Sequence, residues 1–219
     1  MAAPLLDVAD LRFEWPDGFT LSVARFALAA GEAVAVVGPS GCGKSTFLHL
    51  AAGILRPAAG AVRFEGTDWA ARSERERRRR RRTRIGLVFQ EFELLDHLDA
   101  TENVLLPRLV AGEVDAGARA RAEQLLEAAG IAHLAGRKPR RMSHGERQRV
   151  ALCRALSTAP SLVLADEPTG NLDPASGETV RALLLGGARE GGGGLVFVTH
   201  DRTGLDGFDR VVDAAEWAS

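Results

Sequence analysis

One stretch near the start of the chain has the residue types and spacing of a phosphate-binding loop. It fits the pattern G-x-x-x-x-G-K-[ST] without a mismatch and reads Gly38-Pro39-Ser40-Gly41-Cys42-Gly43-Lys44-Ser45-Thr46. Glycines in such a loop let backbone N–H groups turn toward phosphates, and the N-terminus of a following helix adds partial positive charge. We expect Lys44 to reach the β- and γ-phosphates of a nucleotide and the Ser45 hydroxyl to ligate Mg²⁺.

Two carboxylates farther along the chain supply the second half of such a site. Asp166 and Glu167 follow the apolar run Leu162–Ala165. Because a hard cation prefers carboxylate oxygen, we expect Asp166 to hold Mg²⁺ directly or through water. Glu167 is placed to orient and deprotonate an attacking water. The alternative is a solvated pair at a strand end, but the apolar run favours the carboxyl edge of a sheet, where ligands of such folds bind.

The residues around the loop predict the elements that must position it. The apolar run 33–37 indicates a short buried strand before the loop, and residues 47–53 indicate a helix that ends at Gly53. A chance glycine-rich turn is the alternative for the motif alone, and the downstream residues make it negligible. The sequence therefore predicts a strand–loop–helix unit around the phosphates.

The N-terminal part predicts a layer of antiparallel strands. Residues 5–30 alternate apolar and polar positions around the turn Trp15-Pro16-Asp17-Gly18, and residues 61–66 indicate another strand. Two interpretations of Trp15 are open from the local sequence. It stacks on the adenine base, or it is a half-buried aromatic residue that closes the hairpin.

In the second half, strands alternate with helices, which predicts a mostly parallel α/β sheet. We expect helices over residues 119–129, 147–157 and 175–185, and strands over residues 85–89, 162–167 and 195–198, the last being the final core strand. The block from Glu91 to Arg141 has a helical pattern that Pro107 and the 112–117 glycine region break into short helices. This block predicts an inserted helical subdomain.

An arginine-rich segment covers residues 72–84, with an unbroken run over Arg77–Arg82. One interpretation is binding to nucleic acid or to an anionic membrane surface. We favour a solvated helix with some frayed character, because the run has no aromatic or groove-reading partners.

Length, composition and charge fit one globular domain. The chain has 219 residues, of which 46% are hydrophobic and 26% charged, and its net charge of −1 argues against a protein that binds nucleic acid electrostatically as a whole. Cys42 and Cys153 have neither zinc nor disulfide spacing, which favours a reducing compartment. Since the sequence has no signal-peptide pattern and no apolar stretch that could span a bilayer, we expect a cytoplasmic protein.

In order and spacing, the motifs resemble those of the ATPase subunits of ABC transporters over essentially the whole chain. The resemblance rests on the phosphate loop, Gln90, Ser143-His144-Gly145-Glu146, the 162–167 strand, Asn171-Leu172-Asp173 and His200. It implies an α/β fold: a P-loop NTPase core with a mostly parallel sheet, an N-terminal antiparallel β layer and an inserted α-helical subdomain. It also implies a single domain over residues 1–219, in which residues 1–90 and 158–219 form the core and residues 91–157 form the helical subdomain.

The resemblance also implies a role for each motif residue. Trp15 takes the position of the aromatic residue that stacks on adenine. Gln90 takes the position of a residue that senses Mg²⁺ and water and couples to the membrane partner. His200 takes the position of the residue that holds the γ-phosphate. Ser143 and Gly145 match the signature segment, which contacts the γ-phosphate bound by the opposite subunit, and Asp173 matches a loop that crosses the dimer interface. The implied activity is ATP hydrolysis. Its catalytic residues are Glu167, His200, Gln90 and Lys44; its Mg²⁺ ligands are Ser45, Gln90 and Asp166; and ATP contacts the nine loop residues with Trp15, Ser143, Gly145 and Asp173.

The signature segment also has a physical logic of its own. A serine hydroxyl, a glycine backbone and a helix N-terminus form another anion site. The chain has one copy of each motif, and one chain cannot place two phosphate sites from different subdomains on one γ-phosphate. A head-to-tail homodimer with two ATP molecules between the subunits resolves this. Two residues depart from the family pattern, which usually has glycine in place of His144 and glutamine in place of Glu146. We expect these differences to change the rate of ATP hydrolysis rather than to abolish it.

The residues around Gln90, Thr101 and Asn171 resemble the lipoprotein-releasing and macrolide-exporting group, which also contains the ATPase of the cell-division complex. The implied partner is an integral-membrane permease that exports or extracts lipoprotein, lipid, peptide or drug-like substrates, with the ATPase on the cytoplasmic face of the membrane. The alternatives are a cell-division or other non-transport complex and a DNA-associated ATPase. Nucleic acid is not the expected partner, because long coiled-coil or zinc insertions are absent from the sequence. A small-molecule kinase leaves the signature and His200 unexplained.

Overall fold

A parallel sheet forms the centre of the fold in the computed structural model, which describes residues 3–170, 172–190, 192–215 and 217. Its strand order is β6-β7-β8-β3-β9, and every neighbouring pair is parallel. The strands are β3 (Ala33–Val37), β6 (Ile85–Val88), β7 (Leu162–Asp166), β8 (Gly194–Thr199) and β9 (Arg210–Asp213). Strands β3, β7 and β8 are buried along their whole length, which explains why their sequences are apolar runs rather than alternating patterns.

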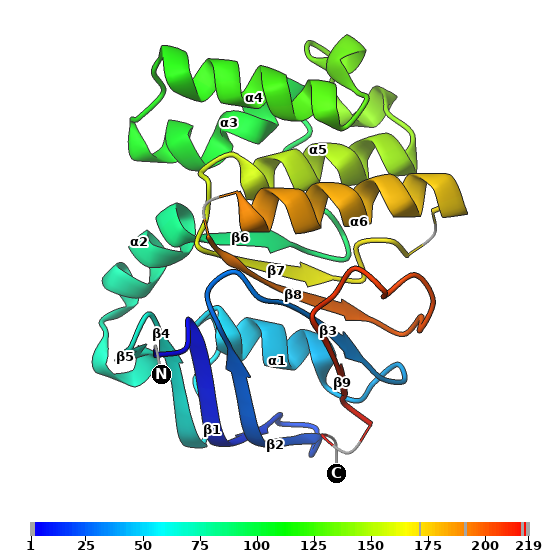
Figure 1. Ribbon diagram of the computed structural model, residues 1–219. Helices are drawn as coiled ribbons and strands as arrows, with labels where there is room; N and C mark the ends of the chain where they lie inside the picture. Colours follow the sequence, from blue (N-terminus) through cyan, green and yellow to red (C-terminus); the bar gives the residue numbers. More distant parts are fainter. Residues whose placement is uncertain (1–2, 171, 191, 216, 218–219) are drawn as a thin grey trace.

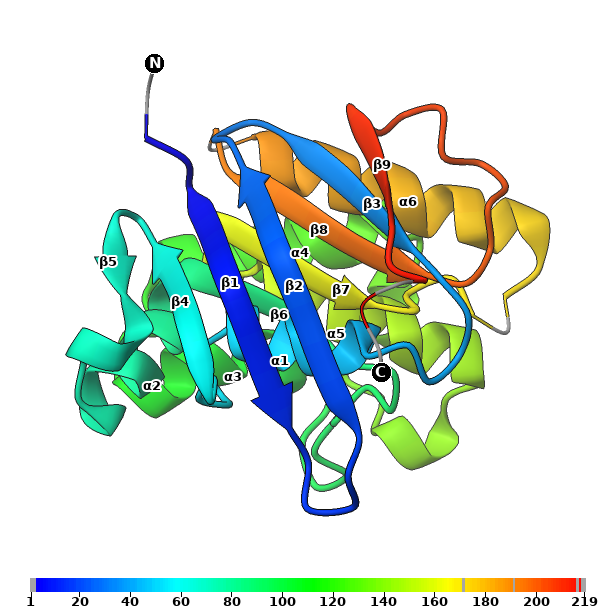
Figure 2. The same cartoon turned by 90° about the horizontal axis from the view of Figure 1, so that it is seen from below.

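A second, antiparallel sheet lies across α1 from the parallel sheet (Figures 1 and 2). Its strand order is β2-β1-β4-β5, and its strands are β1 (Leu6–Glu14), β2 (Thr20–Leu28), β4 (Ala59–Phe64) and β5 (Thr67–Asp68). The turn between β1 and β2 begins at Trp15, whose backbone N–H donates to the Phe19 carbonyl at 2.9 Å. The predicted antiparallel layer is therefore confirmed.

Helices cover both faces of the parallel sheet (Figure 1). Helix α1 (Lys44–Ala51) lies between the two sheets, and α5 (His144–Leu156) and α6 (Pro174–Arg189) cover the opposite face. Helices α3 (Ala100–Ala111) and α4 (Ala116–Ala128) form a further layer over α5, while α2 (Glu74–Arg84) precedes β6 at the edge. Short 3-10 turns cover Trp69–Ala71, Ala132–Leu134 and Pro139–Arg141.

Two hydrophobic cores follow from the alternation of side chains along the parallel strands. Leu162 and Leu164 of β7 face the core that contains α1 and the antiparallel sheet. Val163 and Ala165 face the core formed with α3–α6. Because successive side chains on a strand point to opposite faces, a fully apolar strand supplies both cores at once.

Three expectations about element boundaries are wrong. Pro107 does not break the helical block: it lies inside α3, where the capping box between Asp99 and Glu102 and the burial of Val104 and Leu105 offset the lost hydrogen bond and the steric clash of an interior proline. Residues 195–198 are not the final core strand, since β9 pairs with β3 beyond them. Helices α5 and α6 are longer than expected.

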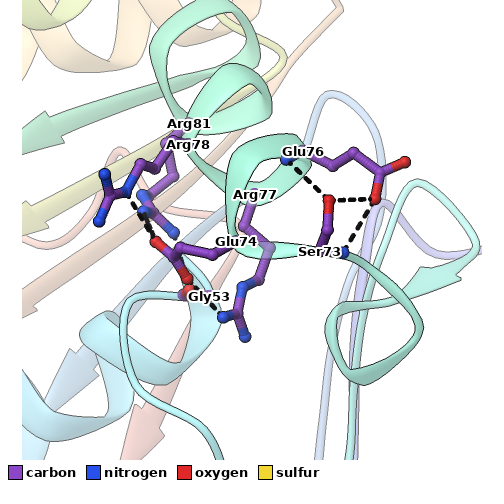
Figure 3. A network of polar contacts seen from close by, with 7 residues as sticks. All are labelled: Gly53, Ser73, Glu74, Glu76, Arg77, Arg78 and Arg81. Atoms are coloured by element: carbon purple, nitrogen blue, oxygen red, sulfur yellow. Dashed lines mark hydrogen bonds and ion pairs between the residues drawn. The ribbon is translucent and has the colours of Figure 1, made fainter.

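The arginine run is not a frayed helix. Helix α2 begins with a capping box between Ser73 and Glu76, and the carboxylate of Glu74 accepts hydrogen bonds from Arg77, Arg78 and Arg81 (Figure 3). These bonds lower the pKa of Glu74 to about 2. Arg77 is buried, and Glu65 binds two more arginines of the helix, Arg80 and Arg84. The bonds to Glu74 therefore stabilise α2 itself, those to Glu65 anchor it to the turn after β4, and the solvated face is restricted to part of the helix.

Candidate functional site

The phosphate loop connects β3 to α1. Gly41 and Gly43 have φ angles of +83° and +92°, and Gly43 is the N-cap of α1. L-residues with side chains rarely adopt such φ values. A Cβ atom at Gly43 would also lie 2.6 Å from Cδ1 of Leu21. The loop therefore needs glycine at this position both for its backbone conformation and for the close approach of β2.

Lys44 is buried at the first turn of α1. Its Nζ atom donates to the carbonyl oxygens of Gly38 at 2.8 Å and Pro39 at 2.9 Å. Among the described residues, it has no carboxylate within ion-pair distance. A buried cation that meets only carbonyl dipoles is incompletely compensated, which makes this loop suited to an anion such as a phosphate.

Asp166 ends β7 and is 8% exposed. Its Oδ1 atom is buried, and within the described chain it has no hydrogen-bond partner. Burial raises the pKa of this carboxyl; the Ser45 hydroxyl opposes the shift, and the neighbouring charge of Glu167 adds to it. A buried, unpartnered carboxylate oxygen beside a serine hydroxyl is the donor set of a hard divalent cation, so these residues fit Mg²⁺.

Glu167 has a strained backbone that directs its side chain toward the end of β8. Its φ angle is +46°, and its N–H donates to the Val198 carbonyl at 2.9 Å. Its Oε1 lies 2.9 Å from Nδ1 of His200, and its Oε2 accepts from the Thr199 hydroxyl at 3.2 Å. A non-glycine residue in this region persists only where its surroundings hold it, and such strain concentrates at functional sites.

One cavity of about 560 Å³ joins the phosphate loop to these carboxylates. The residues expected to act in catalysis or to bind Mg²⁺ line it together, namely Lys44, Ser45, Gln90, Asp166, Glu167 and His200, and Ser40 and Gly41 of the phosphate loop lie beside them. A second hollow of about 320 Å³ adjoins the same loop and is lined by Trp15, Phe19 and Thr46 among others. Trp15 is 36% exposed, and its Nε1 donates to the Thr46 hydroxyl at 3.2 Å, which places a half-exposed ring beside the loop.

The three residues expected to act at the contact with the opposite subunit, Ser143, Gly145 and Asp173, line neither of these hollows. Ser143 is the N-cap of α5, where its hydroxyl accepts from the Glu146 N–H at 3.3 Å, and Gly145 packs toward Leu172. Asp173 is the N-cap of α6. Among the residues that line the cavity, the signature segment of the same chain contributes only His144.

The sequence reasoning missed several residues that shape the cavity. Phe92 lines it with a φ angle of +59°, and the guanidinium of Arg154 on α5 donates to the carbonyls of Phe92 at 2.5 Å and Glu93 at 2.6 Å. Gln148 is buried and donates to the Pro168 carbonyl. These partners are distant in sequence, so the only local signal was a polar side chain on the apolar face of a helix.

His144 contacts the segment after Gln90. Its ring packs edge-on against Phe92, with centroids 4.7 Å apart. We expect His144→Gly to leave ATP turnover within a few-fold of the unmodified chain, because Arg154 still holds the Phe92 carbonyl and glycine costs even a helix interior only ~0.5–1 kcal/mol. Steady-state phosphate release checks this. A collapse of turnover in a variant that remains folded would show that the imidazole has a role of its own.

Comparisons with known proteins agree with this arrangement. The ABC transporter family model matches residues 21–170. The lipoprotein-releasing system ATP-binding protein LolD of Maricaulis maris is 45% identical over 193 residues, which cover 88% of this chain and 84% of that protein. LolD 2 of Caulobacter vibrioides is 47% identical over 182 residues, which cover 83% and 80%.

Solved structures share the fold. The ATP-binding cassette MJ0796 in a dimeric post-hydrolysis state with ADP and Pi has a TM-score of 0.85 and 32% identity, and the match covers 98% of this chain and 97% of that one. Among the described residues, we find no helix that is both long and apolar enough to cross a membrane. The family model, the relatives and the structural neighbours together show that the chain belongs to the ABC transporter family, as one of its ATP-hydrolysing ATP-binding subunits.

Proposed function

We propose that two copies of this chain bind two MgATP molecules between them and that hydrolysis drives a permease which extracts lipoprotein or a related lipid-like substrate from a membrane. One observation carries the proposal. Lys44, Asp166, Glu167 and His200 line one cavity, whereas Ser143 lies outside it. The cavity is therefore half of a site.

The phosphates of ATP bind at the loop from Gly38 to Thr46. Lys44 exchanges its carbonyl partners for phosphate oxygens, and the N-terminus of α1 adds partial positive charge. Ser45, Asp166 and Gln90 would hold Mg²⁺, which when bound would neutralise part of the phosphate charge. Trp15 stacks on the adenine, since its ring borders the hollow beside Thr46.

Glu167 accepts the proton of the attacking water. Its carboxylate is fixed by Thr199 and His200, so it is oriented before the substrate arrives. His200, which is largely exposed, faces the cavity from the end of β8 and holds the γ-phosphate. Gln90 follows β6 at the cavity edge, where it orients the water and reports the state of the site to the permease.

The second copy completes each site. Its Ser143 and Gly145 present a hydroxyl and the N-terminus of α5 to the γ-phosphate, and its Asp173 lies at the interface. The dimeric structure of the MJ0796 cassette supports a pair of cassettes as the working unit.

Movement of the helical layer couples the site to the permease. We assign residues 1–90 and 158–219 to the nucleotide-binding core and residues 91–157 to the helical subdomain. Helix α5 packs on α3 and α4 and also on β6 and α6, so it is the element through which the two parts move together. The relatives named as lipoprotein-releasing support the substrate class. We assign the subunit to the cytoplasmic face of the membrane that holds the permease.

Reconstitution with a permease tests this function. The chain is co-expressed with a candidate permease from the same genome, and ATP turnover is measured in nanodiscs with and without a lipidated substrate protein. We expect turnover to rise when both are present. A chain that is stimulated by DNA and that ignores the permease would instead support a DNA-associated ATPase.

Neutralising Asp166 tests the Mg²⁺ ligand without measuring activity. Because the pKa of Asp166 is raised in the folded state, the folded state binds a proton more tightly than the unfolded state. The charged carboxylate therefore destabilises the fold at pH values above the raised pKa, and this destabilisation is relieved as the pH falls through that pKa. We therefore expect Asp166→Asn to raise the melting temperature of the nucleotide-free chain at neutral pH. The additional stabilisation by MgATP over ATP with EDTA should disappear. Retention of that Mg²⁺-dependent shift would remove Asp166 from the ligand set.

A further inference from the structure

The segment between β6 and α3 carries Gln90 in a tight turn. The backbone N–H of Phe92 donates to the carbonyl of Phe89 at 3.1 Å, which closes a four-residue turn with Gln90 at its second position. Phe92 and the next residue, Glu93, both have left-handed backbones, with φ angles of +59° and +49°. Residues other than glycine rarely adopt this conformation, and two in succession persist only where neighbouring groups hold them. The placement of Gln90 therefore depends on what fixes the backbone behind it.

Arg154, near the end of α5, fixes that backbone. Its Nη2 atom donates to the Phe92 carbonyl at 2.5 Å, and its Nη1 atom donates to the Glu93 carbonyl at 2.6 Å. In the described part of the chain, no other side chain forms a hydrogen bond to the backbone of residues 89–93. Because the guanidinium is planar and its N–H groups have a fixed geometry, it sets the positions of both carbonyls together. One side chain thus holds the two strained residues.

The surroundings of Arg154 show that its guanidinium has no other partner of importance. The residue is 9% exposed, and among the described residues no carboxylate lies within ion-pair distance of it. Burial lowers the pKa of Arg154, and the charge of Glu93 opposes this shift. A buried cation that meets mainly carbonyl dipoles destabilises a fold, and an apolar side chain of similar length would avoid that effect. The feature that benefits from the guanidinium is the backbone after Gln90.

The other end of the same segment is held separately. Asn103 of α3 is fully buried; its Oδ1 atom accepts from the Leu95 N–H at 2.9 Å, and its Nδ2 atom donates to the Leu95 carbonyl at 3.1 Å. These bonds fix the approach to α3 and do not reach the turn at Gln90. Arg154 therefore holds the half of the segment that borders the nucleotide cavity, where Gln90 and Phe92 lie.

We propose that Arg154 is a positioning residue for Gln90, whose turn it holds in the conformation that presents the Gln90 amide to the nucleotide cavity. The inference rests on the proposed function, in which Gln90 orients the attacking water, and it adds the residue that keeps Gln90 in place. Arg154 is not among the described residues that line the cavity, so it acts through the backbone. Since α5 begins after Ser143, the helix that carries the signature segment also places Gln90.

Loss of the two bonds should affect the chemical step more than nucleotide binding. Lys44 and the phosphate loop are held by β3 and α1, to which the Arg154 side chain forms no hydrogen bond in the described chain. Because small displacements of a positioning group are costly, we expect Arg154→Met to lower ATP turnover by between about tenfold and 10²-fold. The affinity for ATP in EDTA should be unchanged, whereas the gain in affinity on adding Mg²⁺ should shrink.

Three variants test whether Arg154 holds the turn. Arg154→Met removes both donors from an unbranched side chain, and Arg154→Lys keeps the charge but replaces the planar fork by a single ammonium group. Arg147→Met is the matched control, because the Arg147 side chain lies on the same helix and forms no hydrogen bond within the described residues. Circular dichroism shows which variants are folded, and Arg154→Lys serves alone if Arg154→Met is not.

Hydrogen exchange of the nucleotide-free chain, followed by mass spectrometry, measures the turn without any hydrolysis. The amides of Phe92 and Glu93 are protected by their bonds to the Phe89 and Glu91 carbonyls. We expect faster exchange in peptides that cover residues 89–93 in Arg154→Met, a smaller change in Arg154→Lys and none in Arg147→Met. Unchanged exchange in a folded Arg154 variant would overturn the inference.

A double-mutant cycle with Gln90→Ala decides whether Arg154 acts through Gln90. Gln90→Ala alone should lower ATP turnover, and Arg154→Met should then add no more than about a twofold further loss, since the group that it positions is already absent. Arg154→Lys should recover part of the turnover only when Gln90 is present.

The cycle also separates this inference from the proposed function. Equal losses from Arg154→Met with and without Gln90 would make Arg154 a structural residue and overturn the inference. That outcome leaves the proposed function intact, because Gln90→Ala would still lower turnover. Full turnover in Gln90→Ala would instead reject the role of Gln90 in the proposed function, and the inference with it.

Discussion

Glu167→Gln is expected to lower ATP turnover by about 10²- to 10⁴-fold while leaving MgATP binding in place, because an amide cannot accept the proton of the attacking water. Glutamine has the shape of glutamate and can still accept from the Thr199 hydroxyl that now bonds Oε2. Removing the charge also removes one cause of the raised pKa of Asp166, so Mg²⁺ binding should not weaken. ATP would then stay bound, and the dimer that it holds closed should accumulate.

The measurements are single-turnover hydrolysis and sedimentation of the chain with ATP, ADP or no nucleotide. We expect a dimer that persists with ATP in Glu167→Gln and only briefly in the unmodified chain. Glu123→Gln, an exposed glutamate on α4, is the matched control and should leave both readouts unchanged. Undiminished hydrolysis in Glu167→Gln would reject the role of the carboxylate as the base.

The elements around the cavity were predictable because their signals are local. The apolar strands before Gly38 and Asp166 are buried on both faces, and no other environment suits such runs in a chain of this length. The phosphate loop can be identified from the spacing of its own glycines, lysine and serine. Together these features fixed the sheet edge at which Lys44 and Asp166 meet.

The features that were missed depend on contacts between distant residues. Strand β9 is short and largely exposed, and it becomes a strand because β3 offers an unpaired edge. The arginine run resembled a solvated helix because the partners of its outer residues, Glu65 and the Gly53 carbonyl, lie in other elements. Phe92 and Arg154 are joined only once α5 packs under the Gln90 segment. The local sequence pattern around each of these residues does not indicate its distant partner.

A mixture of two inactive variants is expected to recover activity if each site uses both copies of the chain. Ser143→Asp keeps an N-cap at α5, since aspartate caps as well as serine, but places a negative charge against the partner's γ-phosphate. Losing this donor and adding repulsion should reduce turnover by ~10²-fold or more. Its melting temperature should stay near that of the unmodified chain, which separates anion binding from capping.

Glu167→Gln and Ser143→Asp are each inactive alone for different reasons. In a heterodimer, the core of the Ser143→Asp chain has a normal Glu167 and faces the normal Ser143 of the other chain, so one of its two sites is intact. With random pairing, half of the dimers are mixed, and turnover should recover to about a quarter of the unmodified level if the two sites act independently. The chains are mixed without nucleotide, given MgATP and assayed for phosphate release.

The control for this mixture combines both substitutions in one chain. Mixed with the unmodified chain, the double variant forms heterodimers in which each of the two sites has one normal and one altered half, so neither site is intact. In a dimer of two double variants, neither site has a normal half. A site built within one chain predicts the opposite pattern: the two single variants never rescue each other, and the double variant leaves its partner fully active. Ser143 caps α5 outside the cavity that holds Lys44 and Glu167, so the geometry of one chain already separates these residues. Recovery in the first mixture would therefore identify the missing half of the cavity as the second copy of the chain.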